Sequence, residues 1–214
     1  VSKQVQVIAT SSAVVCNDNV QLSLDEDCRS AVSPDDVLEG SYGCYDDYQV
    51  QVFNSLGQNL GNILTSANIG QTLRVNVRHI PSGNFCWGSV SVEDKLPPVP
   101  LCPDVWAVCA ARDFSPGYLS GVLGIAAAAG SATDNCTLKS LTYIDGDMVD
   151  ADCDFRVGGR EVSAYFVRKW TAVDASGNTG TCEQNVYLER RHVWDVVMPA
   201  DEDVACSSAA SARV

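Results

Sequence analysis

The sequence predicts an all-β protein with two β-sandwich domains in tandem. Three observations lead to this fold class: apolar and polar residues alternate along many short segments, turn-forming residues lie between them, and cysteine spacings repeat. Alternation with a period of two is the pattern of a half-buried strand. Short strands separated by turn signals every roughly 8–12 residues are typical of a sandwich.

The alternation places the expected strands. In the first half they cover residues 5–8, 20–24, 48–52, 73–77 and 87–92, and in the second half residues 162–166 and 186–188. Turn-forming sequences such as 81–84 and 174–178 lie between strands because glycine, proline, asparagine and aspartate favour turn conformations. Residues 124–130 are the one helix-prone stretch, and the flanking glycines limit it to a short turn of helix.

The ten cysteines show an internal repeat. Cys86 follows Cys16 by 70 positions, Cys182 follows Cys109 by 73, and inner pairs 16 and 17 apart lie between them. These matching intervals predict a module of about 95 residues. We therefore expect one module over 1–95, a second over 96–192, and the start of a third module or an exchanged strand over 193–214. The proline-rich residues 96–100 form a stiff connector between the two modules.

Each module then contains four cysteines, which allow three pairings that the sequence alone does not distinguish. Spacing favours bridges between opening and closing cysteines and bridges within each inner pair: Cys16–Cys86, Cys109–Cys182, Cys28–Cys44 and Cys136–Cys153. Cys102, in the junction just after the proline-rich connector, is an alternative partner for Cys182. Cys206 is left over at the start of the third unit.

The cysteines and the net charge also limit the expected compartment and the expected classes of partner. The cysteines are dispersed, with no Cys-x-x-Cys pair, which favours disulfides over zinc and indicates an oxidising, extracellular compartment. No apolar run approaches the about 18 residues needed to cross a bilayer. The net charge of −13 argues against nucleic acid and anionic membrane surfaces as partners.

Little in the sequence points to catalysis or to a cofactor. There are two histidines, His79 and His192, and no nucleophile elbow, phosphate loop or zinc-protease motif, so we expect no catalytic residues and no enzyme. The densest acidic stretch includes Asp145, Asp147 and Asp150, which are weak calcium candidates because Ca²⁺ prefers closely spaced carboxylates. The calcium-loop fingerprint is absent, which favours a solvated acidic loop.

The four tryptophans allow two interpretations, packing inside the protein or stacking against a sugar. Trp87, Trp106, Trp170 and Trp194 recur near strand starts, where core or junction packing is favoured over a sugar-stacking platform.

Several segments of the second half form a recognisable pattern. They are Val92-Glu93-Asp94-Lys95-Leu96-Pro97-Pro98, then Leu101-Cys102-Pro103-Asp104, Thr133-Asp134-Asn135-Cys136, and the closing segment from Trp170 to Cys182, which contains Asp174-Ala175-Ser176-Gly177-Asn178. Together they resemble hyalin-repeat domains. These segments cover roughly residues 92–190. The resemblance implies an immunoglobulin-like sandwich with an adhesive or structural role. The whole chain resembles tandem-repeat extracellular surface and fibre proteins of Bacteroidota-type bacteria.

The sequence therefore predicts a non-enzymatic structural or adhesive protein of a bacterial cell surface. Its expected partners are further copies of itself or neighbouring modules of a longer chain. A strand within 193–214 that has no module of its own could complete a neighbouring subunit and build a fibre head to tail. The alternative is a non-catalytic sugar- or calcium-binding module of a large secreted enzyme.

Overall fold

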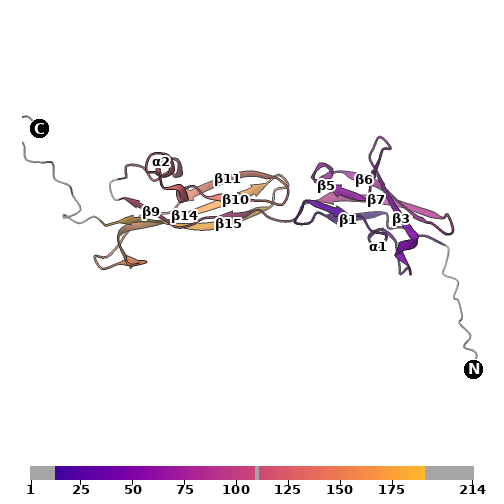
Figure 1. Cartoon of the computed structure of the whole chain (residues 1–214), viewed down its shortest axis with the longest axis horizontal. Helices are drawn as coiled ribbons and strands as arrows, with labels where there is room; N and C mark the ends of the chain where they lie inside the picture. Colours follow the sequence, from indigo (N-terminus) through magenta and orange to yellow (C-terminus); the bar gives the residue numbers. More distant parts are fainter. Residues whose placement is uncertain (1–12, 109–110, 191–214) are drawn as a thin grey trace, which may run out of the picture.

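The computed structural model describes residues 13–108 and 111–190. These residues form two β-rich bodies placed end to end, with the chain passing once between them (Figure 1). Each body is a β-sandwich, as the alternation predicts. The strand expected at residues 5–8 and the segment 193–214 lie outside the described residues. No helix in the described part of the chain has the length and apolar character needed to cross a bilayer.

The first sandwich packs a five-stranded sheet against a two-stranded one. The larger sheet has the order β1-β7-β6-β3-β4, and β2 pairs with β5 in the smaller sheet. Valine and leucine side chains from both sheets and from α1 fill the space between them. The elements are β1 (Asn19–Ser23), β2 (Arg29–Ala31), α1 (Pro34–Val37), η1 (Tyr45–Asp47), β3 (Tyr48–Phe53), β4 (Asn59–Gly61), β5 (Ile63–Thr65), η2 (Ser66–Asn68), β6 (Thr72–His79) and β7 (Phe85–Glu93).

The second sandwich has a sheet of order β11-β14-β15-β9, with β12 and β13 also paired to β14, and a small β10-β8 sheet. Two short helices, α2 and η3, complete its core. The elements are β8 (Val99–Leu101), β9 (Val105–Val108), α2 (Pro116–Gly121), η3 (Ala126–Ala128), β10 (Ser131–Thr133), β11 (Leu138–Asp145), β12 (Val149–Asp150), β13 (Arg156–Val157), β14 (Arg160–Asp174) and β15 (Thr179–Glu189).

The two sandwiches share one plan. In each, the strand at the edge of the large sheet runs parallel to the last strand, β1 beside β7 and β9 beside β15. In each, a cysteine three residues before that edge strand is bridged to the last strand, by Cys16–Cys86 and Cys102–Cys182. Cys102 is thus the structural counterpart of Cys16, and the internal repeat begins seven residues earlier in the second module than cysteine spacing indicates.

The cysteine pairing corrects three of the four expected bridges. The Cys16–Cys86 bridge is present as expected, whereas Cys182 pairs with Cys102 instead of Cys109, which lies outside the described residues. The inner pairs do not form: Cys28 bonds to Cys136 across the two sandwiches, and Cys44 and Cys153 are free and exposed. Cysteine spacing within one module could not predict this bridge, because Cys28 and Cys136 lie in loops of different modules that meet where the modules join.

The strand predictions from alternation match β1, β3, β6, β7, β14 and β15, and residues 126–128 form the short helical turn expected there. Two aromatic predictions have opposite outcomes. Trp170 is 5% exposed and belongs to the core, whereas Trp87 is 68% exposed, which contradicts the packing expected for it. Alternation identified this strand and its buried Val90 and Val92, but Trp87 is an odd number of positions from both valines and lies on the opposite, outward face. α2 was not predicted because its residues carry no apolar helical period.

Candidate functional site

In the structure the connector between the sandwiches covers residues 94–98, between β7 and β8, and it lies against the second sandwich. Adding a Cβ to Gly180, in β15, would bring it to 2.0 Å from the carbonyl oxygen of Pro98, so only glycine fits there. The side-chain amide of Asn178 donates hydrogen bonds to the carbonyl oxygens of Asp94 at 2.9 Å and Leu96 at 3.4 Å. The connector is therefore held along its length and does not act as a free tether.

Asn178 is itself held by Asp174, at the end of β14. The Asp174 carboxylate accepts hydrogen bonds from the Asn178 backbone N–H at 2.7 Å and from its side-chain amide at 2.8 Å. Asp174 is fully buried, although it ends a strand that leads into a turn. The turn that the sequence predicts at 174–178 thus has a second role, because it positions the amide that holds the connector.

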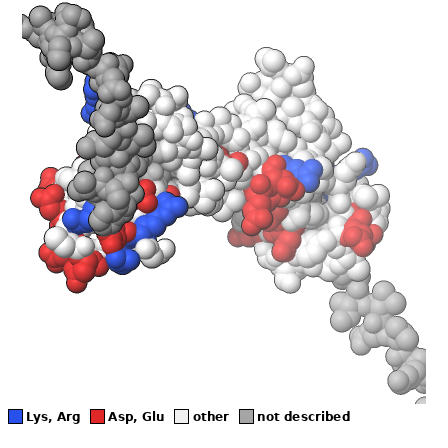
Figure 2. All heavy atoms as spheres, turned by 60° about the vertical axis from the view of Figure 1, so that its left-hand side comes forward, with Lys and Arg blue, Asp and Glu red and all other residues white. Residues whose placement is uncertain are grey.

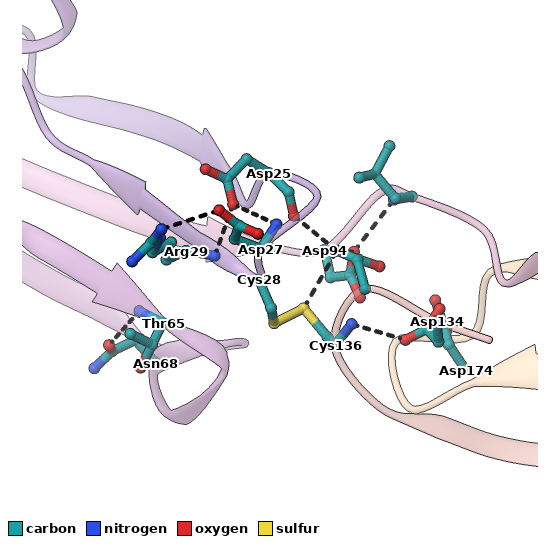
Figure 3. Close-up of a disulfide and its surroundings, with 12 residues drawn as sticks. Asp25, Asp27, Cys28, Arg29, Thr65, Asn68, Asp94, Asp134, Cys136 and Asp174 are labelled. Atoms are coloured by element: carbon teal, nitrogen blue, oxygen red, sulfur yellow. Dashed lines mark hydrogen bonds and ion pairs between the residues drawn. A yellow bond between two sulfur atoms is a disulfide. The ribbon is translucent and has the colours of Figure 1, made fainter.

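A second connection crosses the junction from the first sandwich. Cys28 closes the tight turn after Asp25 and is bonded to Cys136, with Cα atoms 4.9 Å apart (Figure 3). Beside this bridge, the side-chain amide of Asn135 donates to the carbonyl oxygen of Asp25 at 3.0 Å and to Asp94 Oδ1 at 3.3 Å. Residues from the first sandwich, the connector and the second sandwich therefore meet at one point.

Three aspartates gather at this point. Asp94 comes from the connector, Asp134 from the loop after β10, and Asp174 from the end of β14 (Figure 3). Each offers a carboxylate oxygen, and these oxygens lie within 4.8 Å of one another. Asp94 is 6% exposed and Asp174 is fully buried. None of the ion pairs found among the described residues involves any of the three.

Acidic groups also lie on the surface close by. Acidic side chains gather on the part of the first sandwich nearest the waist of the molecule (Figure 2). Asp25, Glu26 and Asp27 line a shallow hollow there together with Leu96 of the connector. Asp27 forms an ion pair with Arg29 at 2.9 Å, and both side chains are largely exposed. The junction is therefore negative both at its surface and in its interior.

The aspartates singled out from the sequence do not join this cluster. Asp145 pairs with the buried Arg168, with carboxylate-to-guanidinium distances of 2.6 and 3.0 Å. Asp147 and Asp150 are exposed, before and in β12. Acid density along the chain pointed to these residues, whereas the cluster draws one aspartate from each of three distant segments. All three segments belong to the sequence that resembles hyalin repeats, and this is the signal that could have identified them.

A second surface feature lies on the first sandwich. The outward face of β3, β6 and β7 carries Phe85, 64% exposed, and Trp87, 68% exposed. The strand register places Asn76 between Trp87 and Gln51, and Arg78 between Phe85 and Gln49. Arg74 lies over the ring of Phe53, with 5.1 Å from its guanidinium carbon to the ring centre. This aromatic face combines flat rings with amide and guanidinium donors on one sheet.

No protein-family model matches the chain, and no curated protein matches it. Among solved structures it is similar to a titin fragment of domains I67–I69, at 9% identity and a TM-score of 0.31, which covers 82% of this chain and 64% of that one. It is also similar to a Drosophila N-cadherin EC1–4 fragment, at 14% identity and a TM-score of 0.23, covering 83% and 50% respectively. A human protocadherin-24 EC1–2 fragment gives 12% identity and a TM-score of 0.28, covering 83% and 99%.

The chain spans less than two thirds of the titin and N-cadherin chains. TM-scores of 0.23 to 0.31 lend no support to a functional assignment. The fold class therefore rests on the strand order and register of each sandwich.

Proposed function

We propose that the chain is a non-enzymatic extracellular structural and adhesive protein whose two sandwiches act as one stiff unit. The observation that carries the proposal is the Cys28–Cys136 bridge, which joins the sandwiches at a point separate from the polypeptide connector. Three disulfides among the described residues are typical of an oxidising, extracellular compartment.

Two attachments restrict motion far more than one. Domains joined by a single linker are expected to move relative to one another unless their interface is large and apolar. Here the connector is fixed by Asn178, and the bridge with its neighbour Asn135 ties a turn of the first sandwich to a loop of the second. Bending about the connector would have to stretch the bridge, so stiffness follows without a large apolar interface.

Small-angle X-ray scattering tests this stiffness. We expect the wild type to scatter as a single extended particle, and the Cys28→Ser/Cys136→Ser variant to show a broader distance distribution with the flexibility typical of tethered domains. The Cys44→Ser/Cys153→Ser variant is the matched control, because it also removes two cysteines but breaks no bridge. Identical scattering from all three proteins would contradict the proposal.

The proposal extends to where the protein is found and to how its copies assemble. The resemblance of the whole chain to surface and fibre proteins of Bacteroidota-type bacteria supports a bacterial cell surface as the setting, and the strand expected in 193–214 would let copies join head to tail. Electron microscopy of the chain with and without residues 193–214 separates these possibilities. Filaments formed by the full chain and lost on truncation support assembly by strand addition, whereas filaments that survive truncation exclude it.

The aromatic face favours a second candidate function, binding of an anionic polysaccharide. Flat rings that are mostly exposed stack against sugar rings, and neighbouring amides hydrogen-bond hydroxyl groups. Arg74 and Arg78 have no acidic partner among the ion pairs of the described residues, although the chain carries a net charge of −13. Guanidinium groups pair well with carboxylate or sulfate groups on a sugar chain.

Affinity electrophoresis in gels containing alginate, heparin or neutral dextran measures this binding. We expect the acidic polysaccharides to retard the wild type more than dextran does, and both Trp87→Ala and Arg78→Gln to weaken the retardation. Phe155→Ala, an exposed aromatic of the second sandwich, is the matched control. Equal mobility of wild type and Trp87→Ala in every gel would exclude the aromatic face as a polysaccharide site.

A further inference from the structure

Among the residues that the structure describes, no lysine or arginine forms an ion pair with any of the three junction aspartates. Asp94 and Asp174 are buried, and the carboxylate oxygens of the cluster lie within 4.8 Å of one another. Like charges at this separation repel strongly when water is largely excluded, and removing a carboxylate from water is itself costly. Every lysine and arginine ion pair found in the described residues lies elsewhere.

Two buried side-chain oxygen atoms, in Asp134 and its neighbour Asn135, have no hydrogen-bond partner. Asp134 Oδ1 is buried and has no hydrogen-bond partner, while the other carboxylate oxygen of Asp134 accepts a bond from the Cys136 backbone N–H at 3.0 Å. Asn135 Oδ1 is likewise buried and without a partner. Buried polar atoms in proteins are almost always paired, so two unpaired oxygens on adjacent residues support the binding of a further group beside them.

We propose that Asp94, Asp134 and Asp174 bind a calcium ion at the junction. Two oxygens bound to one Ca²⁺ at about 2.3–2.6 Å are at most about 4.6–5.2 Å apart, which accommodates the separations in the cluster. Three carboxylates supply up to six oxygens, and Ca²⁺ accepts six to eight from carboxylates, carbonyls, amides and water. Mg²⁺ is the poorer match because it requires shorter bonds, keeps several waters and rarely occupies all-protein sites.

The ion would join the parts of the junction that are otherwise held by separate contacts. Asp94 belongs to the connector, Asp134 lies two residues before the bridging Cys136, and Asp174 supports the turn that holds the connector. The site does not depend on the proposed adhesive role, because ion binding is measured on the isolated chain. Calcium binding can therefore be confirmed even if the junction proves flexible and no polysaccharide binds. Equally, a stiff junction or polysaccharide binding can be confirmed even if the chain binds no calcium.

Isothermal titration calorimetry of the oxidised full chain, stripped with a chelator and titrated with CaCl₂ or MgCl₂, tests the proposal. We expect saturable binding of one Ca²⁺ per chain at a Kd of about 10⁻³ M or tighter, with weaker binding of Mg²⁺. Asp134→Asn keeps the shape of the side chain and removes one charged ligand, so it should weaken Ca²⁺ binding at least tenfold. Asp147→Asn, an exposed aspartate of the weak calcium stretch, is the matched control and should bind as the wild type does.

Thermal unfolding of the same proteins measures calcium binding a second way, through the shift in Tm. Calcium should raise the Tm of the wild type and of Asp147→Asn by several degrees, and raise that of Asp134→Asn less, because a ligand that binds only the folded state stabilises it. The proposal is wrong if the wild type shows neither heat nor a Tm shift at 10-fold above the expected Kd. It is also wrong if Asp134→Asn binds calcium as tightly as the wild type, or if Asp147→Asn loses the binding.

Discussion

The two sandwiches follow the same strand plan but differ in what they bury. In the first, the buried residues of the core are all valines and leucines. Among the described residues, the buried polar and charged ones are Asp94, Arg168, Asp174 and Gln184, all in the connector or the second sandwich. The difference shows that one β-sandwich plan can be stabilised mainly by apolar burial, while its repeat also uses polar contacts that fix loops and the junction.

Gln184 and Arg168 show how those polar contacts work. The Gln184 side chain donates to the carbonyl oxygens of Pro103 at 2.7 Å and Ala127 at 3.1 Å, and accepts from the indole N–H of Trp170 at 3.1 Å. Arg168 donates to Asp145 and to the carbonyl oxygen of Phe114. The carbonyl groups of Pro103, Phe114 and Ala127 lie outside the paired strands, in two loops and in η3, so these side chains hold them against the sheet.

The shared plan is tested first, by removing the bridge that the two sandwiches have in common. Opening a loop of 70 or 80 residues should cost about 4 kcal/mol of unfolding free energy in each case. We therefore expect Cys16→Ser/Cys86→Ser and Cys102→Ser/Cys182→Ser to lower stability by similar amounts, each in its own sandwich. Differential scanning calorimetry measures both, and a loss confined to one variant would show that the bridges are not equivalent.

The difference in buried polar groups is tested by Asp145→Ala. This change leaves the fully buried Arg168 without its carboxylate partner, which should destabilise the second sandwich by about 3 kcal/mol, since Asp145 is partly exposed and the usual range is about 3–5 kcal/mol. Hydrogen exchange should show faster opening of β14 and β15 while β6 and β7 stay protected. Asp147→Ala, nearby and exposed, should have little effect.

Each sandwich contains a glycine that lies very close to a backbone carbonyl oxygen of another segment. A Cβ on Gly88 would lie 2.2 Å from the carbonyl oxygen of Asn17, and one on Gly180 would lie 2.0 Å from that of Pro98. Each glycine-to-alanine change should cost about 1–3 kcal/mol by forcing the backbone apart. Gly88→Ala should affect only the segment before β1, whereas Gly180→Ala should also change amide chemical shifts in the connector. Unchanged shifts for residues 94–98 in Gly180→Ala would mean that this contact does not hold the connector.

The smallest expected effect is a change in the pKa of Asp113, just before α2 in the second sandwich. The Ser115 hydroxyl and backbone N–H both donate to Asp113, which lowers the pKa of that carboxyl below its usual value. A lowered folded-state pKa gives stability that is present above the unfolded value of about 4 and is lost as pH falls through the folded value. Ser115→Ala should raise the Asp113 pKa toward the ordinary value, measured by NMR titration of the carboxyl carbon.

The sequence predicted the strands better than the contacts between them. Alternation identified β6 and β7 because valines on one face of each strand are buried in an aliphatic core. Trp87 was misplaced because it lies on the opposite face of β7 from the buried valines. Cysteine spacing identified Cys16–Cys86, which closes one sandwich, but could not identify Cys28–Cys136, because a bridge between modules leaves no repeating interval. The aspartate cluster was missed for the same reason, since its members are brought together only at the junction.

The central claim is that the junction holds the two sandwiches in one fixed arrangement. Residual dipolar couplings of backbone amides in a dilute aligning medium measure the orientation of each sandwich separately. We expect β1–β7 and β8–β15 to report the same alignment tensor, with equal magnitude and axes that agree when both are expressed in the coordinates of the whole chain. Two tensors of clearly different magnitude in the oxidised protein would contradict the claim, because they would mean that the sandwiches reorient independently despite the Cys28–Cys136 bridge.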